Sequence, residues 1–357
     1  MEEIDLKRII LTGGGTAGHV TPNIALLPSL KKEGFDVHYI GSYDGIERKL
    51  IENMKVQYHG IASGKFRRYF DVKNFTDPIR VLKGYREASS LIKKLKPDVI
   101  FSKGGFVSVP VVTASKRRRV PCIIHESDIT PGLANKISIP FADKVCVNFP
   151  ETLNHIPEGK AVLTGTPIRK ELYSGNKIQG LDFCGFSLNK PVILVMGGSS
   201  GAQAINIQIR ATLPELLEKF QVIHLCGNGN IDNEYKNLPG YVQFEYINEE
   251  LSNLFAAADI VVSRAGANAI CELLALRKPT ILIPLPLGAS RGDQILNAQS
   301  FERQGFSFLL KEEDLNSSSL LSAVKKVYIN KEMYIDNMNK SEQGDSIETI
   351  MNLIKSF

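Results

Sequence analysis

The chain alternates short apolar runs with longer segments of mixed polarity. Short apolar runs bounded by turn residues are typical of buried strands, and amphipathic segments between them suit helices that cover a sheet. In the first half we expect strands at 7–12, 37–40, 56–59, 98–102, 120–125, 144–147 and 161–164, with helices such as 23–33 and 79–95 between them. In the second half we expect strands at 191–196, 221–226, 242–246, 260–263 and 280–284, and a helical chain after Leu315. This alternation predicts an α/β protein with parallel sheets.

Two of the expected strands are each followed by a glycine-rich turn and a helix. Residues 13–19 read Gly-Gly-Gly-Thr-Ala-Gly-His, and residues 197–202 read Gly-Gly-Ser-Ser-Gly-Ala. Glycine lets backbone N–H groups approach a ligand closely, and the following helix adds the positive end of its dipole, which suits phosphate or pyrophosphate. A tight strand-to-helix turn that binds no ligand is a good explanation for one such segment. It explains much less well why two of them occur in the same chain. The pattern therefore predicts two Rossmann-like halves.

The length of 357 residues fits two domains better than one core. We expect a first domain at residues 1–168, a second at 169–340, and a last helix at 341–357 that crosses back to the first. Residues 169–189 are rich in Gly, Asn and Ser, which indicates a connection between the domains.

Composition narrows the class of protein further. The net charge of +5 is too small to indicate nucleic acid as a partner. Five scattered cysteines without a C-x-x-C pair favour free thiols in a reducing compartment. The acidic N-terminus does not look like a signal peptide, and no apolar run approaches the ~20 residues of a membrane-spanning helix. We expect a cytosolic protein that at most lies on a membrane surface.

Gly13, Gly15 and Gly18 also satisfy G-x-G-x-x-G, the dinucleotide-binding pattern. A nicotinamide or flavin dehydrogenase needs an acidic residue at the end of the second strand to hold the ribose. Asp44 comes several residues too late for that role. The dehydrogenase interpretation is therefore disfavoured.

The second half carries a better candidate for a nucleotide site. Gly266 makes a turn between an expected strand and the helix that contains Asn268 and Glu272. A carboxylate on that helix can accept hydrogen bonds from both hydroxyls of a ribose, although an isolated Glu is by default a solvated surface residue. Gln294 begins the next helix after a Pro/Gly-rich loop and offers a donor and an acceptor to a sugar.

Aromatic, aliphatic and cationic residues interleave at residues 63–83, where we single out Phe66, Arg67, Arg68, Phe70 and Phe75. A second basic run occupies residues 116–119. A solvated helix face is the simpler interpretation of a charge run. The interleaved phenylalanines favour a surface that lies on anionic lipid.

Six motifs then occur in one order: residues 13–23, 125–128 (His-Glu-Ser-Asp), 164–169 (Thr-Gly-Thr-Pro-Ile-Arg), 197–202, 263–272 and 294–298. Together they resemble the MurG family of glycosyltransferases over nearly the whole chain. The resemblance implies a GT-B fold, in which two Rossmann-like domains with parallel sheets face each other across a cleft. It implies inverting transfer of N-acetylglucosamine from UDP-GlcNAc to the C4 hydroxyl of the muramoyl sugar of undecaprenyl-linked lipid I, giving lipid II for peptidoglycan. No cofactor is implied. The implied location is the inner face of the cytoplasmic membrane, with anionic lipids and other cell-wall synthesis proteins as partners.

The resemblance also implies roles for individual residues. It assigns UDP-GlcNAc binding to Thr16, Ala17, Gly18, Asp128, Arg169, Ser199, Ile247, Asn268, Glu272 and Gln294. Among these, Ile247 would lie against the uracil and Glu272 would hold the ribose. The sequence departs from the family pattern at Ala17, where glycine is common, and at Asp128, where asparagine is common. Ala269 and Cys271 replace hydroxyl residues, so hydroxyl contacts to the pyrophosphate do not carry over there.

An inverting transfer needs a base for the acceptor hydroxyl, and histidine is the usual base near neutral pH. His19 is the candidate, with Glu126 orienting the acceptor or assisting the base. No His and carboxylate cluster stands at metal-ligand spacing, so Arg169 and helix N-termini are expected to stabilise the leaving UDP. Three alternatives stay open: a GT-B enzyme acting on another lipid, a UDP-GlcNAc epimerase, and a non-enzymatic anchor subunit.

Overall fold

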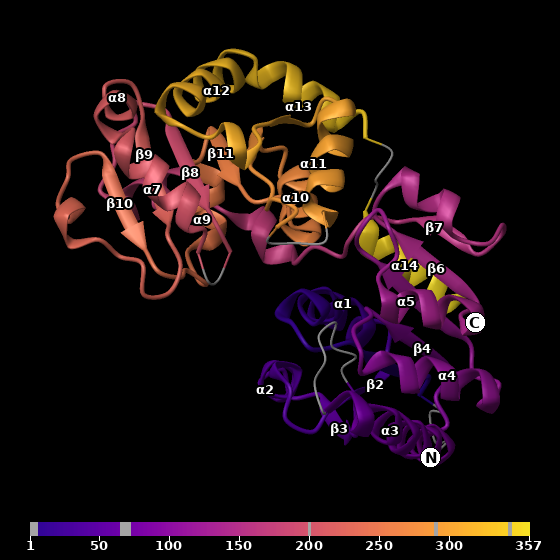
Figure 1. Cartoon of the computed structure of the whole chain (residues 1–357). Coiled ribbons are helices and arrows are strands. Elements are labelled where there is room, and N and C mark those ends of the chain that lie inside the picture. Colours follow the sequence, from indigo (N-terminus) through magenta and orange to yellow (C-terminus); the bar gives the residue numbers. More distant parts are fainter. Residues whose placement is uncertain (1–5, 65–72, 199–200, 289–291, 342–344) are drawn as a thin grey trace. The chain divides into compact units, whose positions relative to one another are not determined.

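The computed structural model describes residues 6–64, 73–198, 201–288, 292–341 and 345–357. The chain divides into two compact units (Figure 1). The first unit comprises Met1–Arg169 and Gln343–Phe357, and the second comprises Lys170–Glu342.

The first unit is built on one parallel sheet in the order β3-β2-β1-β4-β5-β6-β7. Its strands are β1 (Arg8–Thr12), β2 (Asp36–Ser42), β3 (Gln57–Ile61), β4 (Val99–Ser102), β5 (Cys122–Glu126), β6 (Lys144–Val147) and β7 (Ala161–Leu163). Its helices are α1 (Thr21–Lys32), α2 (Ile46–Glu52), α3 (Lys73–Leu95), α4 (Ser108–Arg118), α5 (Leu133–Ser138) and α14 (Ser346–Lys355), with the short η1 (Ala17–His19), η2 (Ile139–Phe141) and η3 (Pro150–His155).

Two apolar layers cover the two faces of this sheet. Successive strand residues point to opposite faces, so Ile9 and Leu11 enter one layer while Ile10 enters the other. The layer around Ile9 contains buried residues of α1, α2 and α14, and the layer around Ile10 contains buried residues of α3 and α4. Figure 1 shows the yellow α14 among the elements of the first unit, although it is last in the chain. Its Ile350 is fully buried.

The second unit repeats the plan with the parallel order β10-β9-β8-β11-β12-β13. Its strands are β8 (Val192–Met196), β9 (Gln221–Leu225), β10 (Tyr241–Phe244), β11 (Ile260–Ser263), β12 (Thr280–Leu282) and β13 (Ser307–Leu309). Its helices are η4 (Lys170–Ser174), α6 (Lys177–Cys184), α7 (Gln203–Ala211), α8 (Leu213–Leu217), η5 (Asn233–Tyr235), α9 (Leu251–Ala257), α10 (Ala267–Ala275), α11 (Asp293–Arg303), η6 (Glu312–Asp314), α12 (Ser317–Ile329) and α13 (Lys331–Asn339). The prediction of two Rossmann-like domains with parallel sheets is confirmed.

One segment differs from its expected structure. Residues 169–189 were expected to be a connection because of their Gly, Asn and Ser content, yet they form η4 and α6, which pack on α9 within the second unit. A Cβ on Gly175 would lie 2.0 Å from the Ser252 carbonyl oxygen, and one on Gly180 would lie 2.2 Å from that of Asn253. These glycines therefore permit close packing of a helix pair. The three-residue β13 was not expected from the sequence, because so short a run carries little pattern.

Candidate active site

In each unit the strand order reverses beside the first strand, between β1 and β4 in the first sheet and between β8 and β11 in the second. Ligands of open α/β sheets bind at the carboxyl ends of strands at such a reversal. The turn after β1 contains Thr16, Ala17, Gly18 and His19, and α10, which begins after the turn that follows β11, contains Asn268 and Glu272.

In the first unit, buried groups hold the turn after β1 in place. Glu47 of α2 is fully buried, and its carboxylate accepts hydrogen bonds from the N–H of Gly15 at 3.1 Å, the N–H of Ser42 at 3.0 Å and the Ser42 hydroxyl at 2.5 Å. A Cβ on Gly14 would lie 2.6 Å from that carboxyl group. The N–H of Gly14 donates to the Gly104 carbonyl at 3.3 Å.

These contacts change the expected role of the first glycine turn. Backbone N–H groups of the turn at 13–19 were expected to approach a phosphate, but those of Gly14 and Gly15 already donate within the unit. A buried carboxylate beside them also disfavours an anion there. The glycines are needed because the turn passes closely over Glu47. No sequence pattern pointed to Glu47, which resembled any surface carboxylate of an amphipathic helix.

The rigid turn presents Thr16 and His19 at its outer end. The Thr16 hydroxyl lies 3.0 Å from Nδ1 of His19, and the N–H of His19 donates to the Thr16 carbonyl at 3.1 Å. Thr16 and Ala17 are exposed, whereas Gly18 and His19 are half-buried. The structure thus brings the expected base together with one expected substrate-binding residue.

Glu126, at the end of β5, organises the turn that follows it. Its carboxylate is 4% exposed and accepts four hydrogen bonds. The donors are the N–H groups of Ser127, Asp128 and Gly132 and the side-chain amide of Asn135, at 2.8 to 3.0 Å. Burial raises the pKa of this carboxyl above its usual value. Glu126 is therefore built to hold the turn, including Asp128, in position.

His125, the residue before Glu126, is fully buried and neutral. Its Nε2 lies 2.9 Å from the Gly165 carbonyl oxygen and its Nδ1 lies 2.8 Å from Nζ of Lys103. A carbonyl can only accept, so Nε2 carries the proton and Nδ1 accepts from Lys103. Burial, assisted by the Lys103 charge, holds the pKa of His125 well below its usual range. Sequence inspection did not single out Lys103.

In the second unit, the expected donor-site residues come from separate turns at the same edge of the sheet. Gly198 and Gly201, in the turn after β8, have φ of +86° and +76°, which favour glycine. Glu272 and Asn268 lie on α10 directly after Gly266, and both are half-buried. Ile247 lies in the loop after β10.

The turns after β11 and β12 are connected by Arg264. Its guanidinium donates to the carbonyl oxygens of Ile283 at 3.1 Å and Pro284 at 3.3 Å, and it forms an ion pair with Glu312. Gln294, the second residue of α11, accepts a hydrogen bond from the N–H of Leu285 at 3.2 Å. Residues 283–285 of the loop after β12 are thereby held in place.

Several expected residues cannot be placed in this way. Ser199 and the membrane candidates Phe66, Arg67, Arg68 and Phe70 lie outside the described residues. Phe75 belongs to α3, but its side chain is likewise outside the description. Arg169 is the last residue of the first unit's main segment, and its Nε is buried without a hydrogen-bond partner among the described residues.

Within the residues that the structure describes, no group of three or more His, Cys, Asp or Glu side chains is arranged to hold a metal ion. In the same residues, no helix combines the length and the apolar character needed to cross a bilayer.

Comparisons with known proteins bear on both units. Residues 9–147 match the glycosyltransferase family 28 N-terminal domain, and residues 192–354 match the corresponding C-terminal domain. The chain is 65% identical over 350 residues to a protein of Lachnoclostridium phytofermentans named UDP-N-acetylglucosamine--N-acetylmuramyl-(pentapeptide) pyrophosphoryl-undecaprenol N-acetylglucosamine transferase, with 98% of this chain and 99% of the relative covered. A protein of the same name from Lachnospira eligens is 64% identical over 350 residues, with the same coverage.

Among solved structures, MurG of Acinetobacter baumannii superimposes with a TM-score of 0.80 at 23% identity, covering 98% of this chain and all of the other. That likeness shows the shared fold, and the domain matches and close relatives show the family. The chain therefore belongs to glycosyltransferase family 28 and, within it, to the MurG family of N-acetylglucosaminyltransferases.

Proposed function

We propose that the chain transfers N-acetylglucosamine from UDP-GlcNAc to the C4 hydroxyl of the muramoyl sugar of lipid I, with inversion at the anomeric carbon, to give lipid II. The observation that carries this proposal is 65% identity across 98% of the chain to an enzyme whose name states this donor and acceptor. The two glycine turns, each at a reversal in strand order, agree with it.

In this proposal His19 is the general base. With the Nδ1 proton donated to the Thr16 hydroxyl, Nε2 carries the lone pair that accepts a proton from the acceptor hydroxyl. Thr16 then acts by fixing the tautomer and orientation of the ring. Glu126 acts as a positioning residue for the 127–135 turn, because its four hydrogen bonds hold that turn together.

The donor side of the proposal rests on the second unit. Glu272 accepts from the ribose hydroxyls, Ile247 lies against the uracil, and Gln294 binds the sugar. Asn268 and Ser199 complete the second unit's part, and Arg169, at the end of the first unit's main segment, provides positive charge for the departing UDP. No divalent metal is invoked.

The reaction is tested by incubating the full chain with UDP-GlcNAc and a short-chain lipid I analogue. We expect a disaccharide product and release of UDP. Free-sugar epimerisation would support the epimerase alternative, and no turnover would support the anchor alternative. His19→Ala should lower kcat on the soluble acceptor by about 10²–10⁴ while UDP binding stays unchanged. A near-normal kcat would exclude His19 as the base.

The proposal includes a membrane-facing surface on the first unit, called here the basic-apolar face. It consists of Ile79, Leu82, Lys83 and Arg86 of α3 and residues 116–119 at the end of α4. The four α3 positions follow an i, i+3, i+4, i+7 spacing, so they share one side of the helix. Ile79 is 71% and Leu82 51% exposed.

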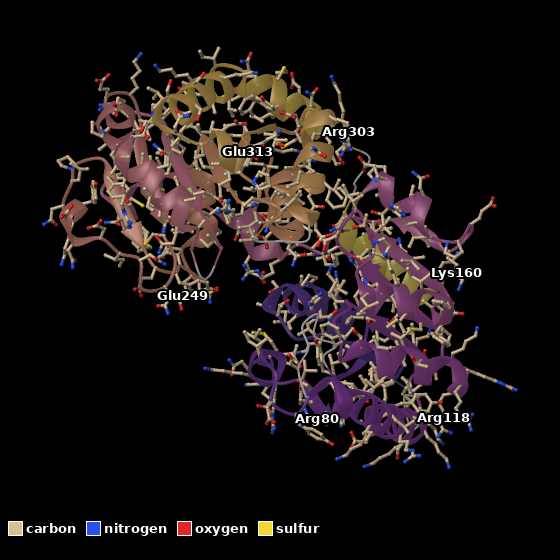
Figure 2. All side chains as sticks on the ribbon, in the orientation of Figure 1. Arg80, Arg118, Lys160, Glu249, Arg303 and Glu313 are labelled. Carbon is tan, nitrogen blue, oxygen red and sulfur yellow. The ribbon has the colours of Figure 1, made fainter. Side chains whose placement is uncertain are left out.

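The two basic segments belong to one surface. Arg118 donates from Nε to the Ser89 carbonyl at 3.1 Å and to the Ser89 hydroxyl at 2.9 Å, which joins the end of α4 to α3. Figure 2 shows Arg80 of α3 and Arg118 at the same edge of the first unit. Exposed apolar side chains among cations suit an anionic bilayer surface.

Membrane binding is tested by sedimentation with anionic vesicles. The double variant Ile79→Ser with Leu82→Ser should bind less, because it removes apolar area from the interface. Ile329→Ser is the matched control, since Ile329 is 78% exposed in the second unit. High salt should also weaken binding of the wild type. Equal binding by the double variant and the control would exclude this face.

A further inference from the structure

The amino ends of the strands in the second unit carry cations around one carboxylate. Asp259 directly precedes β11, and its carboxylate accepts a hydrogen bond from the N–H of Val192, the first residue of β8, at 3.0 Å. The ammonium of Lys331 lies 3.3 Å from Oδ1 of Asp259, and that of Lys177 lies 3.9 Å from Oδ2. One carboxylate therefore has two cationic partners.

Lys278, two residues before β12, adds a third cation beside the same carboxylate. Its side chain is half-buried, and its Nζ donates to the carbonyl of Ala258, the residue before Asp259, at 2.8 Å. Burial is the main cause that lowers the pKa of Lys278 from 10.5 to about 8. The Asp259 charge opposes this shift, and the charges of Lys177 and Lys331 add to it. We call Lys177, Lys278 and Lys331 the lysine cluster.

The lysine cluster carries more positive charge than the surrounding side chains neutralise. Three ammonium groups and the Asp259 carboxylate leave a net charge of +2 when all are ionised. The carboxylates on α6 and α13 are exposed, and among the described residues none of them forms an ion pair with the cluster: Asp182, Glu332 and Asp336. Glu250, before α9, instead accepts a hydrogen bond from the Asn253 side chain at 2.7 Å.

Two of these lysines occupy positions that are unfavourable for their own helices. Lys177 is the first residue of α6, and Lys331 is the first residue of α13. The N-terminus of a helix carries the positive end of its dipole, so acidic residues are favoured there and cations are disfavoured. A local rule that is broken twice around one carboxylate is typical of a functional site.

The lysine cluster is open to solvent and lies apart from the candidate donor site. The side chain of Lys177 is 50% exposed and that of Lys331 is 30% exposed. The candidate donor residues follow the carboxyl ends of β8, β10 and β11, whereas the lysine cluster lies at the amino ends of β8, β11 and β12. A ligand of the cluster is therefore distinct from UDP-GlcNAc bound in the proposed manner.

We propose that the lysine cluster binds the phosphate group of a small molecule or of a lipid headgroup. A phosphate monoester carries about −1.5 to −2 charges at pH 7, which matches the surplus charge of the cluster, whereas a carboxylate brings only one. Each ammonium has three N–H donors, and the described contact of Lys278 uses one of them. The remaining donors point to phosphate oxygens. This site is independent of the proposed transfer reaction.

The test follows the reaction of Lys278 itself, so phosphate bound elsewhere in the chain does not interfere. The full chain is acetylated at pH 7 with N-hydroxysuccinimidyl acetate, and peptide mass spectrometry gives the initial rate at Lys278. Only the unprotonated amine reacts, and a bound dianion favours the protonated form. We expect saturating potassium phosphate to slow this acetylation about tenfold, which corresponds to a rise of about one in the pKa of Lys278. Potassium acetate at equal ionic strength should slow it less than twofold, because it screens charge without supplying a dianion.

Matched controls separate the cluster from other lysines. Lys160 is half-buried in the first unit, and its Nζ donates to the Ala142 carbonyl at 2.7 Å, so its acetylation rate should change less than twofold with phosphate. Lys331→Met removes one cation of the cluster and should raise the phosphate concentration for half-protection of Lys278 about tenfold. Lys325→Met, which removes an exposed cation of α12, should leave that concentration within twofold of the wild type.

Vesicles that contain phosphatidic acid distinguish the two sources of the phosphate, with phosphatidylcholine vesicles as the reference. Protection of Lys278 by these vesicles alone would assign the site to a lipid headgroup, and protection by inorganic phosphate would assign it to a soluble ligand. Protection by neither, or equal protection by acetate, would overturn the proposal. Lys177→Met decides the matter if Lys331→Met does not fold, because it removes a cation on a different helix and should give the same tenfold change. Unchanged half-protection in either folded variant would also overturn the proposal.

Discussion

Replacing Glu47 by Gln should loosen the turn that carries His19. The native carboxylate accepts three hydrogen bonds and is fully buried. A glutamine offers one oxygen in place of two, so it loses at least one charged hydrogen bond, about 1.5–3 kcal/mol. Its NH₂ group also faces a backbone N–H, which leaves a buried donor unsatisfied at about 1–3 kcal/mol. Together the two losses lower the expected free energy of unfolding of the first unit by about 2.5–6 kcal/mol.

Hydrogen exchange is the suitable assay, because a chain of two units need not unfold in one step. Peptides that cover residues 8–20 should exchange at least 100-fold faster in Glu47→Gln, whereas peptides of the second unit should be unchanged. Activity on the soluble acceptor should fall as well, because the turn positions His19.

Glu52→Gln is the matched control for this measurement. Glu52 lies on the same helix, is 50% exposed and pairs with Arg48 at 2.9 Å. An exposed pair at this spacing contributes about 0.3–0.5 kcal/mol. If Glu47→Gln exchanges no faster than Glu52→Gln over residues 8–20, the buried carboxylate does not support the turn and the reasoning is wrong.

Three further predictions address the second unit and the reaction conditions. Glu272→Ala should weaken UDP binding by about 1–3 kcal/mol in calorimetry, and unchanged affinity would exclude the ribose assignment. Exhaustive EDTA treatment should leave turnover intact, and loss of activity that Mg²⁺ or Mn²⁺ restores would contradict this. Burial lowers the pKa of His224 from its ordinary value of 6.5 to about 3. At pH values between these two, the unfolded chain therefore binds a proton at this residue that the folded chain does not bind. Stability should therefore fall by about 1.4 kcal/mol per pH unit from pH 6 to pH 4 on account of His224, and His224→Gln should reduce that slope in chemical denaturation at each pH.

The sequence by itself determined the fold class and the family. Alternation of apolar strands with helices, and two glycine turns after strands, are local patterns that predict parallel sheets without knowledge of any distant contact. The motifs from residues 13–23 to 294–298 identified the family from their order alone, and the close relatives agree. The placement of His19 beside Thr16 also follows locally, because the two residues are one turn apart.

Tertiary structure decided which residues support those motifs. Glu47 is 33 positions from Gly14 in the sequence, and Lys103 is 22 positions from His125. Contacts between residues so far apart leave no local pattern in the sequence. The Gly, Asn and Ser content of 169–189 indicated a connection between the domains, but the close approach of its glycines to α9 is visible only once two helices are packed. Hydrogen bonds and close packing join residues that the fold brings together, whereas sequence periodicity reports only on neighbours. The sequence therefore indicated which turns contain the candidate catalytic and binding residues. The folded chain determined which buried charged side chains, such as Glu47 and Lys103, hold those turns in position.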